Sequence, residues 1–253
     1  MAEALLFGVI ASSGLVLGSL VGTKIKIPQR VLAFLLAFAS GSLISALAFE
    51  LFEDAYQKSG AWISGVAFVA GAAVFVTASA WIDRWAPTGT PDSQSPKGEK
   101  RAATTNRASP GFSPAAGFAL LAAVTLDGVP ENVALGISLG EESGGAALLL
   151  AIFASNFPEA VVGSAAMESA GRSARFAVGV WALTAVVLLA AVVAGRVLFS
   201  PDPQTVSIPL AFAGGAVIAS LADTLMPQAF EGGGPLVAFA TVAGFFLSYL
   251  LSL

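Results

Sequence analysis

The sequence contains no cysteine and no histidine among its 253 residues. Without cysteine there are no disulfides and no thiolate metal ligands, and cysteine usage gives no indication of the redox compartment. Without histidine the chain lacks the commonest metal ligand and the side chain that ordinarily titrates near neutral pH. A Ser-His catalytic dyad is excluded for the same reason. An ion site in this chain is therefore expected to use oxygen ligands.

Charged residues are also scarce, at 11% of the chain, whereas 56% of residues are hydrophobic and the mean hydropathy is +0.83. A soluble domain carries roughly a quarter charged residues. Several apolar runs approach the ~20 residues that cross a bilayer as a helix. The sequence therefore predicts an all-α, multi-pass membrane protein whose partner is the lipid bilayer, and it predicts no nucleic-acid partner.

Hydropathy and turn residues predict eight transmembrane helices within a single domain, residues 1–253. The first apolar run lacks a basic leader and a cleavage site, so it is predicted to stay as the first helix. Residues 83–114 are rich in Pro, Ser, Thr, Gly and charge, which predicts a disordered cytoplasmic loop after the third span. The predicted spans are Ala2 to Val21, Val31 to Asp54, Ala61 to Ile82, Ala115 to Leu139, Ala146 to Met167, Phe176 to Phe199, Ser207 to Pro227 and Leu236 to Leu253.

The basic residues predict the orientation, because cytoplasmic loops carry an excess of Lys and Arg. An outside N-terminus places ten of the twelve basic residues in inward loops and leaves only Lys58 and Arg196 elsewhere. An even number of spans then puts both termini outside. The ten are Lys24, Lys26, Arg30, Arg84, Lys97, Lys100, Arg101, Arg107, Arg172 and Arg175.

Residues 39–48 of the second span resemble residues 213–222 of the seventh. The likeness continues through Leu51 with Leu225, and the two spans are predicted to run in opposite directions. Matched segments of opposite direction indicate inverted-topology repeats, which place a substrate near the midplane of the membrane. The alternative is that small residues recur by chance in apolar helices.

Two short runs place oxygen-bearing side chains inside long apolar stretches: residues 126–131 (Leu-Asp-Gly-Val-Pro-Glu) and 155–159 (Ser-Asn-Phe-Pro-Glu). In a helix Asp127 and Glu131 share one face, as do Ser155 and Glu159. Each proline also frees the carbonyl four residues before it. Two such helices facing each other would form an oxygen-lined cage, which suits a hard or borderline cation.

A charged group at the centre of a transmembrane helix costs approximately 2.5–3.5 kcal/mol on insertion scales. Asp127, Glu131 and Glu159 therefore need compensation, and no Lys or Arg lies in the middle of a predicted span. We expect a metal ion, a proton or the two in alternation to supply it. The alternative is that hydroxyls and amides of a packed bundle satisfy these acids.

Further acids are candidates for an ion pathway. Glu50, with Asp54 beside it, lies near the outer end of the second span and is expected to line an entrance. Asp223 lies toward the inner half of the seventh span and is expected to line an exit. The alternatives are a solvated helix end for Asp54 and a capped core acid for Asp223. Asn132 and Ser138 are predicted to form ordinary hydrogen bonds between helices, and the alternative is that they support the ligands of the site.

Eight predicted spans, outside termini, a cytoplasmic loop after the third span and two Pro-Glu runs together resemble the ZIP (Zrt-/Irt-like) family of divalent-metal transporters. The resemblance covers nearly the whole chain. The family's fourth-helix motif, His-Asn/Ser-x-Pro-Glu, matches residues 127–131, and its fifth-helix motif, His/Gln-Asn/Asp-x-Pro-Glu, matches residues 155–159. The resemblance implies transport of a divalent cation. It places Glu131 and Glu159 at metal-bridging positions, and Asp127, Ser155 and Asn156 at the other ligand positions.

The departures from the family pattern bear on the metal. Asp127 and Ser155 stand where the family has imidazole or glutamine ligands, and Gly128 stands at the next ligand position. The predicted span 176–199 contains no acid, whereas some members carry a ligand there, so a second metal position is not expected. Zinc is the expected cargo, with Mn, Fe, Co and Cd as alternatives. Oxygen ligands should weaken the preference for Zn over Mn.

Three other functions are alternatives to metal transport. The acids could relay protons for another solute, or the chain could be a metal sensor that keeps the fold without transport. An intramembrane aspartyl protease using Asp127 and Asp223 is disfavoured, because the Gly-x-Gly-Asp and Tyr-Asp contexts are absent. The chain is thus predicted to be a transporter of the cell (inner) membrane, not an enzyme. A homodimer is left open.

Overall fold

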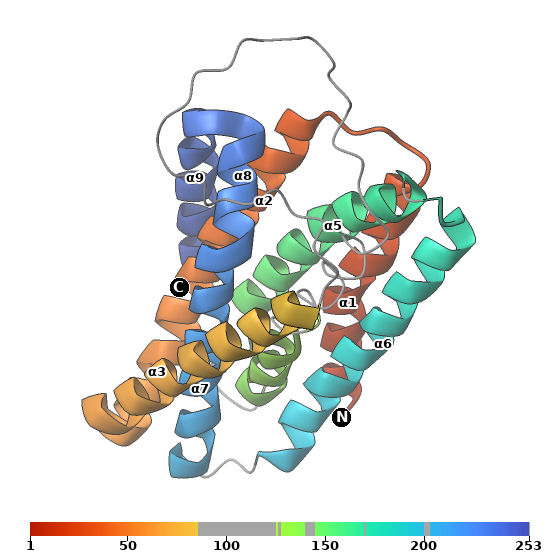
Figure 1. The fold of residues 1–253 in the computed structure, drawn as a ribbon. Helices are drawn as coiled ribbons and strands as arrows, with labels where there is room; N and C mark the ends of the chain where they lie inside the picture. The colour runs from red at the N-terminus through yellow and green to blue at the C-terminus, as the bar shows by residue number, and fades with distance from the viewer. Residues whose placement is uncertain (86–124, 126–127, 140–144, 170, 200–202, 253) are drawn as a thin grey trace.

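The structure is a computed structural model that describes residues 1–85, 125, 128–139, 145–169, 171–199 and 203–252. All regular structure in these residues is helical (Figure 1). A helix at residues 128–138 precedes α5 and has no label in the figure. The labelled elements are α1 (Ala2–Gly22), α2 (Gln29–Ala46), the π-helix η1 (Leu47–Phe52), α3 (Glu53–Trp85), α5 (Ala146–Ser169), α6 (Ala174–Leu198), α7 (Pro203–Ser220), the π-helix η2 (Leu221–Leu225), α8 (Met226–Gly233), the 3-10 helix η3 (Gly234–Leu236) and α9 (Val237–Leu251).

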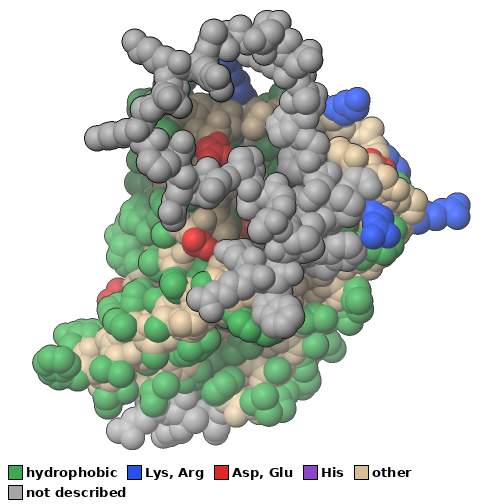
Figure 2. Space-filling model, in the orientation of Figure 1, with side chains coloured by type: hydrophobic (Ala, Val, Ile, Leu, Met, Phe, Trp, Pro, Cys, Tyr) green, Lys and Arg blue, Asp and Glu red, His purple; other side chains and the backbone are tan. Residues whose placement is uncertain are grey.

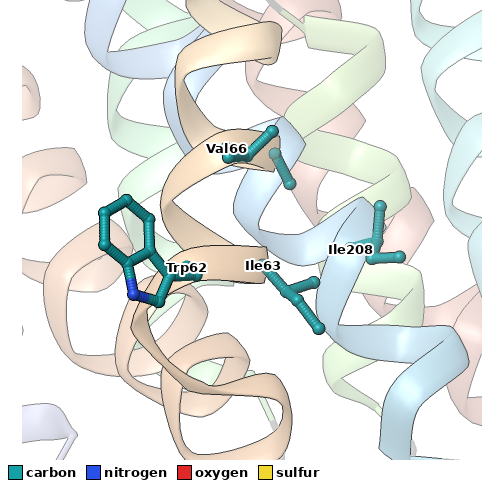
Figure 3. A pocket seen from close by; sticks show the side chains of 5 residues that line it. Trp62, Ile63, Val66 and Ile208 are labelled. Carbon is teal, nitrogen blue, oxygen red and sulfur yellow. The ribbon is translucent and has the colours of Figure 1, made fainter.

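Five helical stretches among the described residues are long and apolar enough to cross a bilayer. Large hydrophobic side chains point outward from them, and Trp62 is the most open, at 87% exposed. Figure 2 shows hydrophobic side chains over much of the visible helical surface. Such a surface is compatible with lipid tails. The prediction of an all-α protein with several long apolar helices is confirmed in the described residues. The stretches are Ala2–Gly22, Gln29–Trp81, Ala146–Ser169, Ala174–Leu198 and Val206–Leu251.

Helix α1 packs against α5 through three glycines at four-residue spacing, Gly14, Gly18 and Gly22. A Cβ on Gly14 would lie 2.9 Å from the carbonyl oxygen of Phe153, and a Cβ on Gly18 would overlap that of Phe157. Gly22 faces a carbonyl one turn further along α5. Small residues let helix backbones approach closely in a bilayer, where packing drives association. Because the contacts advance together along both helices, α1 and α5 are parallel.

Three other helix pairs in the described residues cross at reciprocal glycine contacts, in which a glycine of each helix faces a backbone carbonyl of the other. No side chain fits at these crossings, so the backbones lie against each other. The contacts are Gly41 with Thr241 and Gly244 with Phe38 between α2 and α9, Gly71 with Phe212 and Gly215 with Phe68 between α3 and α7, and Gly136 with Val192 and Gly195 with Val133 between helix 128–138 and α6.

The segments that begin with α2 and with α7 carry the same features 174 residues apart. A π-helix begins at Leu47 in the first segment and at Leu221 in the second. A glycine with positive φ follows in each, Gly60 (φ 74°) and Gly234 (φ 67°), and the chain reverses direction near it (Figure 1). Figure 1 also shows α2 and α7 running in opposite directions. The sequence match of residues 39–48 with 213–222 has the same separation.

The helices form two groups. Helix α1 contacts α5 and α6, and Gly136 of helix 128–138 packs on the backbone of Val192 in α6. The second group consists of α2, α3, α7, α8 and α9, joined by the α2–α9, α2–α8 and α3–α7 contacts. Helix α2 also contacts α5 across the boundary, and Figure 1 shows α5 at the centre of the molecule. The helix with the second Pro-Glu run therefore lies between the two groups.

The predicted boundaries differ from the structure at several helix ends, among them the ends of the second, third and seventh spans; the seventh was predicted to end at Pro227, but α8 continues to Gly233. The second span was predicted to end at Asp54, but helix continues through α3 until the positive φ of Gly60 interrupts it. Residues 83–85, predicted as the start of the loop, continue α3 to Trp85. The reason is that no proline follows Ile82 before Pro87, so nothing local ends the helix earlier. Residues 86–114 of the predicted loop lie outside the described residues.

Candidate functional site

Helix α5 carries the second Pro-Glu run in its interior. Pro158 lies inside the helix and has no N–H, so the carbonyl of Ala154 loses its usual helical partner. Ser155 and Asn156 are buried, and Glu159 is only 7% exposed. The run therefore presents a hydroxyl, an amide and a carboxylate inside the helical bundle.

Hydrogen bonds orient the first two of these side chains. Asn156 Nδ2 donates to the carbonyl of Ala11 on α1 at 3.3 Å, and Ser155 Oγ donates to the carbonyl of Ile152 at 3.0 Å. Both bonds use the donor hydrogens of these groups. The oxygens, Oδ1 of Asn156 and Oγ of Ser155, are then the atoms that can bind a cation.

Residues 128–131 of the first Pro-Glu run belong to the helix at residues 128–138. Glu131 is 5% exposed and Asn132 is fully buried. Asn132 Nδ2 donates to the carbonyl of Gly128 at 2.8 Å, and Oδ1 is buried without a hydrogen-bond partner in the described part of the chain. Asp127 lies outside the described residues, so its place in the site stays a prediction.

The prediction that Asn132 and Ser138 form hydrogen bonds between helices is wrong. Asn132 bonds the carbonyl of Gly128, and Ser138 Oγ donates to the carbonyl of Leu135 at 2.9 Å, so both bonds stay within one helix. Short polar side chains reach the carbonyls three or four residues before them. Apolar neighbouring helices therefore need not supply a partner.

A hydrophobic cluster around Trp181 of α6 connects the two Pro-Glu runs. Ala160, which follows Glu159, belongs to this cluster, and Val129, two residues before Glu131, packs against it. Trp181 is fully buried, and its indole N–H has no hydrogen-bond partner among the described residues. Sequence reasoning missed Trp181, because an aromatic residue in an apolar span faces lipid as readily as the core. Its position brings the two runs to the same region of the first helix group.

The described residues contain no group of three or more acidic side chains that could hold a metal ion. Two of the predicted ligands, Glu131 and Glu159, are buried acids on two different helices. The third acid predicted for the site, Asp127, lies outside the described part of the chain.

Leu188 of α6 occupies the space beside Gly128. A Cβ on Gly128 would lie 2.9 Å from Leu188 Cδ1 and 3.1 Å from Cδ2, and Leu188 is fully buried. The backbone at Gly128 is therefore in contact with a hydrocarbon side chain.

Glu50 is buried between the helix groups, at 3% exposed. It lies in η1, and its Oε2 accepts a hydrogen bond from the backbone N–H of Leu148 at 3.1 Å. Leu148 is in the first turn of α5, where backbone N–H groups have no helical acceptor. The carboxylate thus bonds the beginning of the helix that carries Ser155, Asn156 and Glu159.

The other two acids predicted for a pathway lie apart from the Pro-Glu runs. Asp223 is in η2, is exposed, and accepts a hydrogen bond from Ser79 Oγ of α3 at 3.1 Å. Asp54 Oδ2 is 3.7 Å from Lys58 Nζ one turn later in α3. An ion pair of this kind is ordinary at a partly exposed helix end. The structure brings neither acid into a group with Glu131 and Glu159.

Comparison with known proteins adds no assignment. No protein-family model matches this chain, and no curated protein matches it.

Proposed function

We propose that this chain transports a divalent metal cation across a membrane, in the manner of the ZIP family that its sequence resembles. The observation that carries the proposal is the burial of Glu131 and Glu159 on two helices that pack around the Trp181 cluster. Buried carboxylates in apolar helices are costly and mark ion pathways in membrane proteins. The oxygens of Ser155 and Asn156 lie on the same helix as Glu159 and complete a set that suits a hard or borderline cation.

The proposed ligands are Asp127, Glu131, Ser155, Asn156 and Glu159. Three carboxylates supply three negative charges to one divalent ion, and Pro158 leaves the Ala154 carbonyl as a further oxygen near the site. The divalent ion offsets the charge that the apolar surroundings disfavour. The metal is substrate here, so the site must release it as well as bind it.

The packing supports the proposed topology of eight spans. The stretches Gln29–Trp81 and Val206–Leu251 contain 53 and 46 residues. At about 1.5 Å per residue each far exceeds the ~30 Å core of a bilayer. Gly60 and Gly234 divide each stretch into two spans, and helix 128–138 belongs to the remaining one.

The basic residues support the proposed orientation. Lys24 and Lys26 follow α1. Arg172 lies between α5 and α6, and Arg175 is in the first turn of α6. Because α1 and α5 are parallel, these four residues lie at one end, and Figure 2 shows Lys and Arg at one end of the visible face. We place this end in the cytoplasm and both termini outside the cell (inner) membrane.

The 174-residue correspondence supports inverted repeats as the machinery of transport. The α2 and α7 segments run in opposite directions. Each contains a π-helix followed by a glycine with positive φ. Rocking of one repeat against the other would then expose the site to each side in turn.

Uptake of Zn, Mn, Fe, Co and Cd into proteoliposomes of the purified chain tests the proposal. We expect saturable uptake of at least one of these metals above protein-free vesicles. A pH-sensitive dye inside the same vesicles tests the proton-relay alternative. Proton flux without metal dependence, or no uptake of any of the five metals, would contradict metal transport.

The proposed path runs from the outer side through the site to Asp223. Glu50 bonds the first turn of α5, at the end opposite the basic loops, whereas Asp223 contacts Ser79 near the end of α3. We expect Asp223→Cys to react with a membrane-impermeant thiol reagent from the cytoplasmic side, and Asp54→Cys from the outside. The native chain has no cysteine, so the background is clean. Labelling of position 223 from the outside alone would show the path to be wrong.

The oxygen ligands predict weak discrimination between Zn and Mn. Imidazole favours Zn, whereas carboxylate and amide oxygens suit Mn. We expect Asp127→His to raise the ratio of Zn to Mn affinity by about tenfold. Equilibrium binding of both metals to purified wild type and variant measures this ratio. If wild type already prefers Zn as strongly as Asp127→His does, the explanation by oxygen ligands fails.

A further inference from the structure

The beginning of α5 takes its capping group from another helix. The N–H of Leu149 donates to the carbonyl of Gly145 at 2.9 Å, which makes Gly145 the N-cap residue. An N-cap side chain ordinarily accepts from the N–H of the second or third helical residue, and Leu148 is the third. Gly145 has no side chain to do so. Glu50 Oε2 accepts from Leu148 instead, at 3.1 Å.

The surroundings of Gly145 explain why the cap comes from elsewhere. Gly145 has a φ of 65°, a conformation that other residues rarely adopt. A Cβ at this position would also overlap the Ser138 hydroxyl. Neither serine nor aspartate could therefore replace this glycine and cap α5 locally. A carboxylate is a suitable substitute, because the N-terminus of a helix carries a partial positive charge.

The π-helix η1 presents Glu50 to α5. It buries Leu47, Glu50 and Leu51 and leaves Phe49 exposed. The corresponding position in η2, 174 residues later, is Thr224. Thr224 Oγ1 donates to the carbonyl of Ser220 at 2.8 Å, within its own segment. The acid that reaches α5 is thus a property of one repeat and not of the π-helix itself.

Pro158 makes this cap matter for the site. It removes the hydrogen bond to the Ala154 carbonyl, so residues 146–157 are less firmly tied to the half of α5 that carries Glu159. Polar contacts to other helices hold residues 146–157 near both ends. Glu50 bonds Leu148 at the beginning, and Asn156 bonds the carbonyl of Ala11 near the end.

We propose that Glu50 is a positioning residue for the metal site: it holds the first half of α5 so that Ser155 and Asn156 stay aligned with Glu159. The inference rests on the proposed metal transport. Glu50 acts through α5 and does not need to touch the ion. What it requires is an acceptor that reaches Leu148, and its charge is secondary.

Two substitutions separate reach from charge. Glu50→Gln keeps the length of the side chain and an acceptor oxygen but removes the charge. Glu50→Asp keeps the charge but shortens the side chain by one carbon–carbon bond, about 1.5 Å, which withdraws the acceptor from Leu148. Glu50→Ala removes both. Thr224→Val is the matched control, because Thr224 occupies the equivalent position and its hydrogen bonds to Ser220 stay within its own segment.

Each purified variant is studied by two measurements, hydrogen exchange and metal uptake. Hydrogen exchange of residues 146–150 reports the cap directly and needs no metal. The concentration dependence of metal uptake in proteoliposomes gives KM and the maximal rate. We expect Thr224→Val to match wild type within about twofold, and Glu50→Gln to lie closer to wild type than Glu50→Asp does. For Glu50→Asp and Glu50→Ala we expect exchange and KM to rise about tenfold, the change that loss of one cap produces, with a smaller effect on the maximal rate.

The opposite order would overturn the inference. If Glu50→Asp matches wild type while Glu50→Gln resembles Glu50→Ala, the charge of the side chain matters and its reach to Leu148 does not. If exchange at residues 146–150 is unchanged in Glu50→Ala, the carboxylate does not cap α5. Uptake by wild type tests the proposed function separately, so a wild type that transports while Glu50→Ala keeps its KM contradicts the positioning role alone.

Discussion

Metal uptake is expected to fall by about 100-fold or more when Glu131 or Glu159 is replaced by glutamine. Glutamine keeps the volume and one carbonyl oxygen, so the helices can pack as before. It removes a negative charge from a site that has to bind a divalent ion in apolar surroundings, where charge compensation decides the affinity. Initial rates of uptake into proteoliposomes measure the effect, with the amount of folded protein checked by size-exclusion chromatography.

Glu168→Gln is the matched control for Glu159→Gln. Both residues lie in α5, but Glu168 is near the end of the helix and partly exposed. The same chemical change there should leave uptake within about twofold of wild type, because exposed charges are well solvated. Equal losses in the two variants, or full uptake by Glu159→Gln, would remove the Pro-Glu runs from the transport mechanism.

Gly71→Ala is expected to destabilise the fold by about 1–3 kcal/mol. Gly71 lies where α3 crosses α7, and a Cβ there would overlap the carbonyl oxygen of Phe212. A backbone atom cannot move aside as a side chain can, so the two helices must separate. At about 2–4 °C per kcal/mol for a chain of this size, the midpoint of thermal unfolding should drop by several degrees.

Gly65→Ala provides the control within the same helix. A Cβ at position 65 meets nothing within 4 Å, so the methyl group has room. Alanine favours a helix over glycine by up to about 1 kcal/mol, and we expect the unfolding midpoint to stay or rise. Thermal unfolding of both variants in one detergent gives the comparison. A similar decrease in the two variants would mean that the crossing of α3 and α7 is looser than the structure indicates.

Part of the candidate site follows from the residue sequence alone. Glu131, Ser155, Asn156 and Glu159 are polar residues within apolar runs, and in a bilayer such residues turn toward the protein interior. Their burial agrees with that rule. The role of Glu50 could not be predicted in this way. Its hydrogen bond depends on where the first turn of α5 lies, 98 positions later in the chain.

The hydrogen bonds of Asn132 and Ser138 and the burial of Trp181 differ from expectation for a common reason. Asn132 and Ser138 were expected to bond other helices, but carbonyls of their own helix are closer. Trp181 gave no signal, since hydropathy does not distinguish a side chain that faces lipid from one that faces the core. Both cases depend on which face of a helix meets which neighbour, and a nearly uniform apolar composition does not encode this in its periodicity.

The sequence by itself determined that the chain is helical and apolar enough for a membrane, because a bilayer requires long runs of hydrophobic residues and satisfied backbone groups. It also indicated the likeness of residues 39–48 to residues 213–222, and the π-helices that begin at Leu47 and Leu221 have the same separation. Only the tertiary structure decided the neighbours: Leu188 against Gly128, the Trp181 cluster between the two Pro-Glu runs, and Glu50 at the start of α5. The physical reason is that helix formation and membrane partition depend on local composition, whereas helix contacts depend on where small residues let two backbones meet.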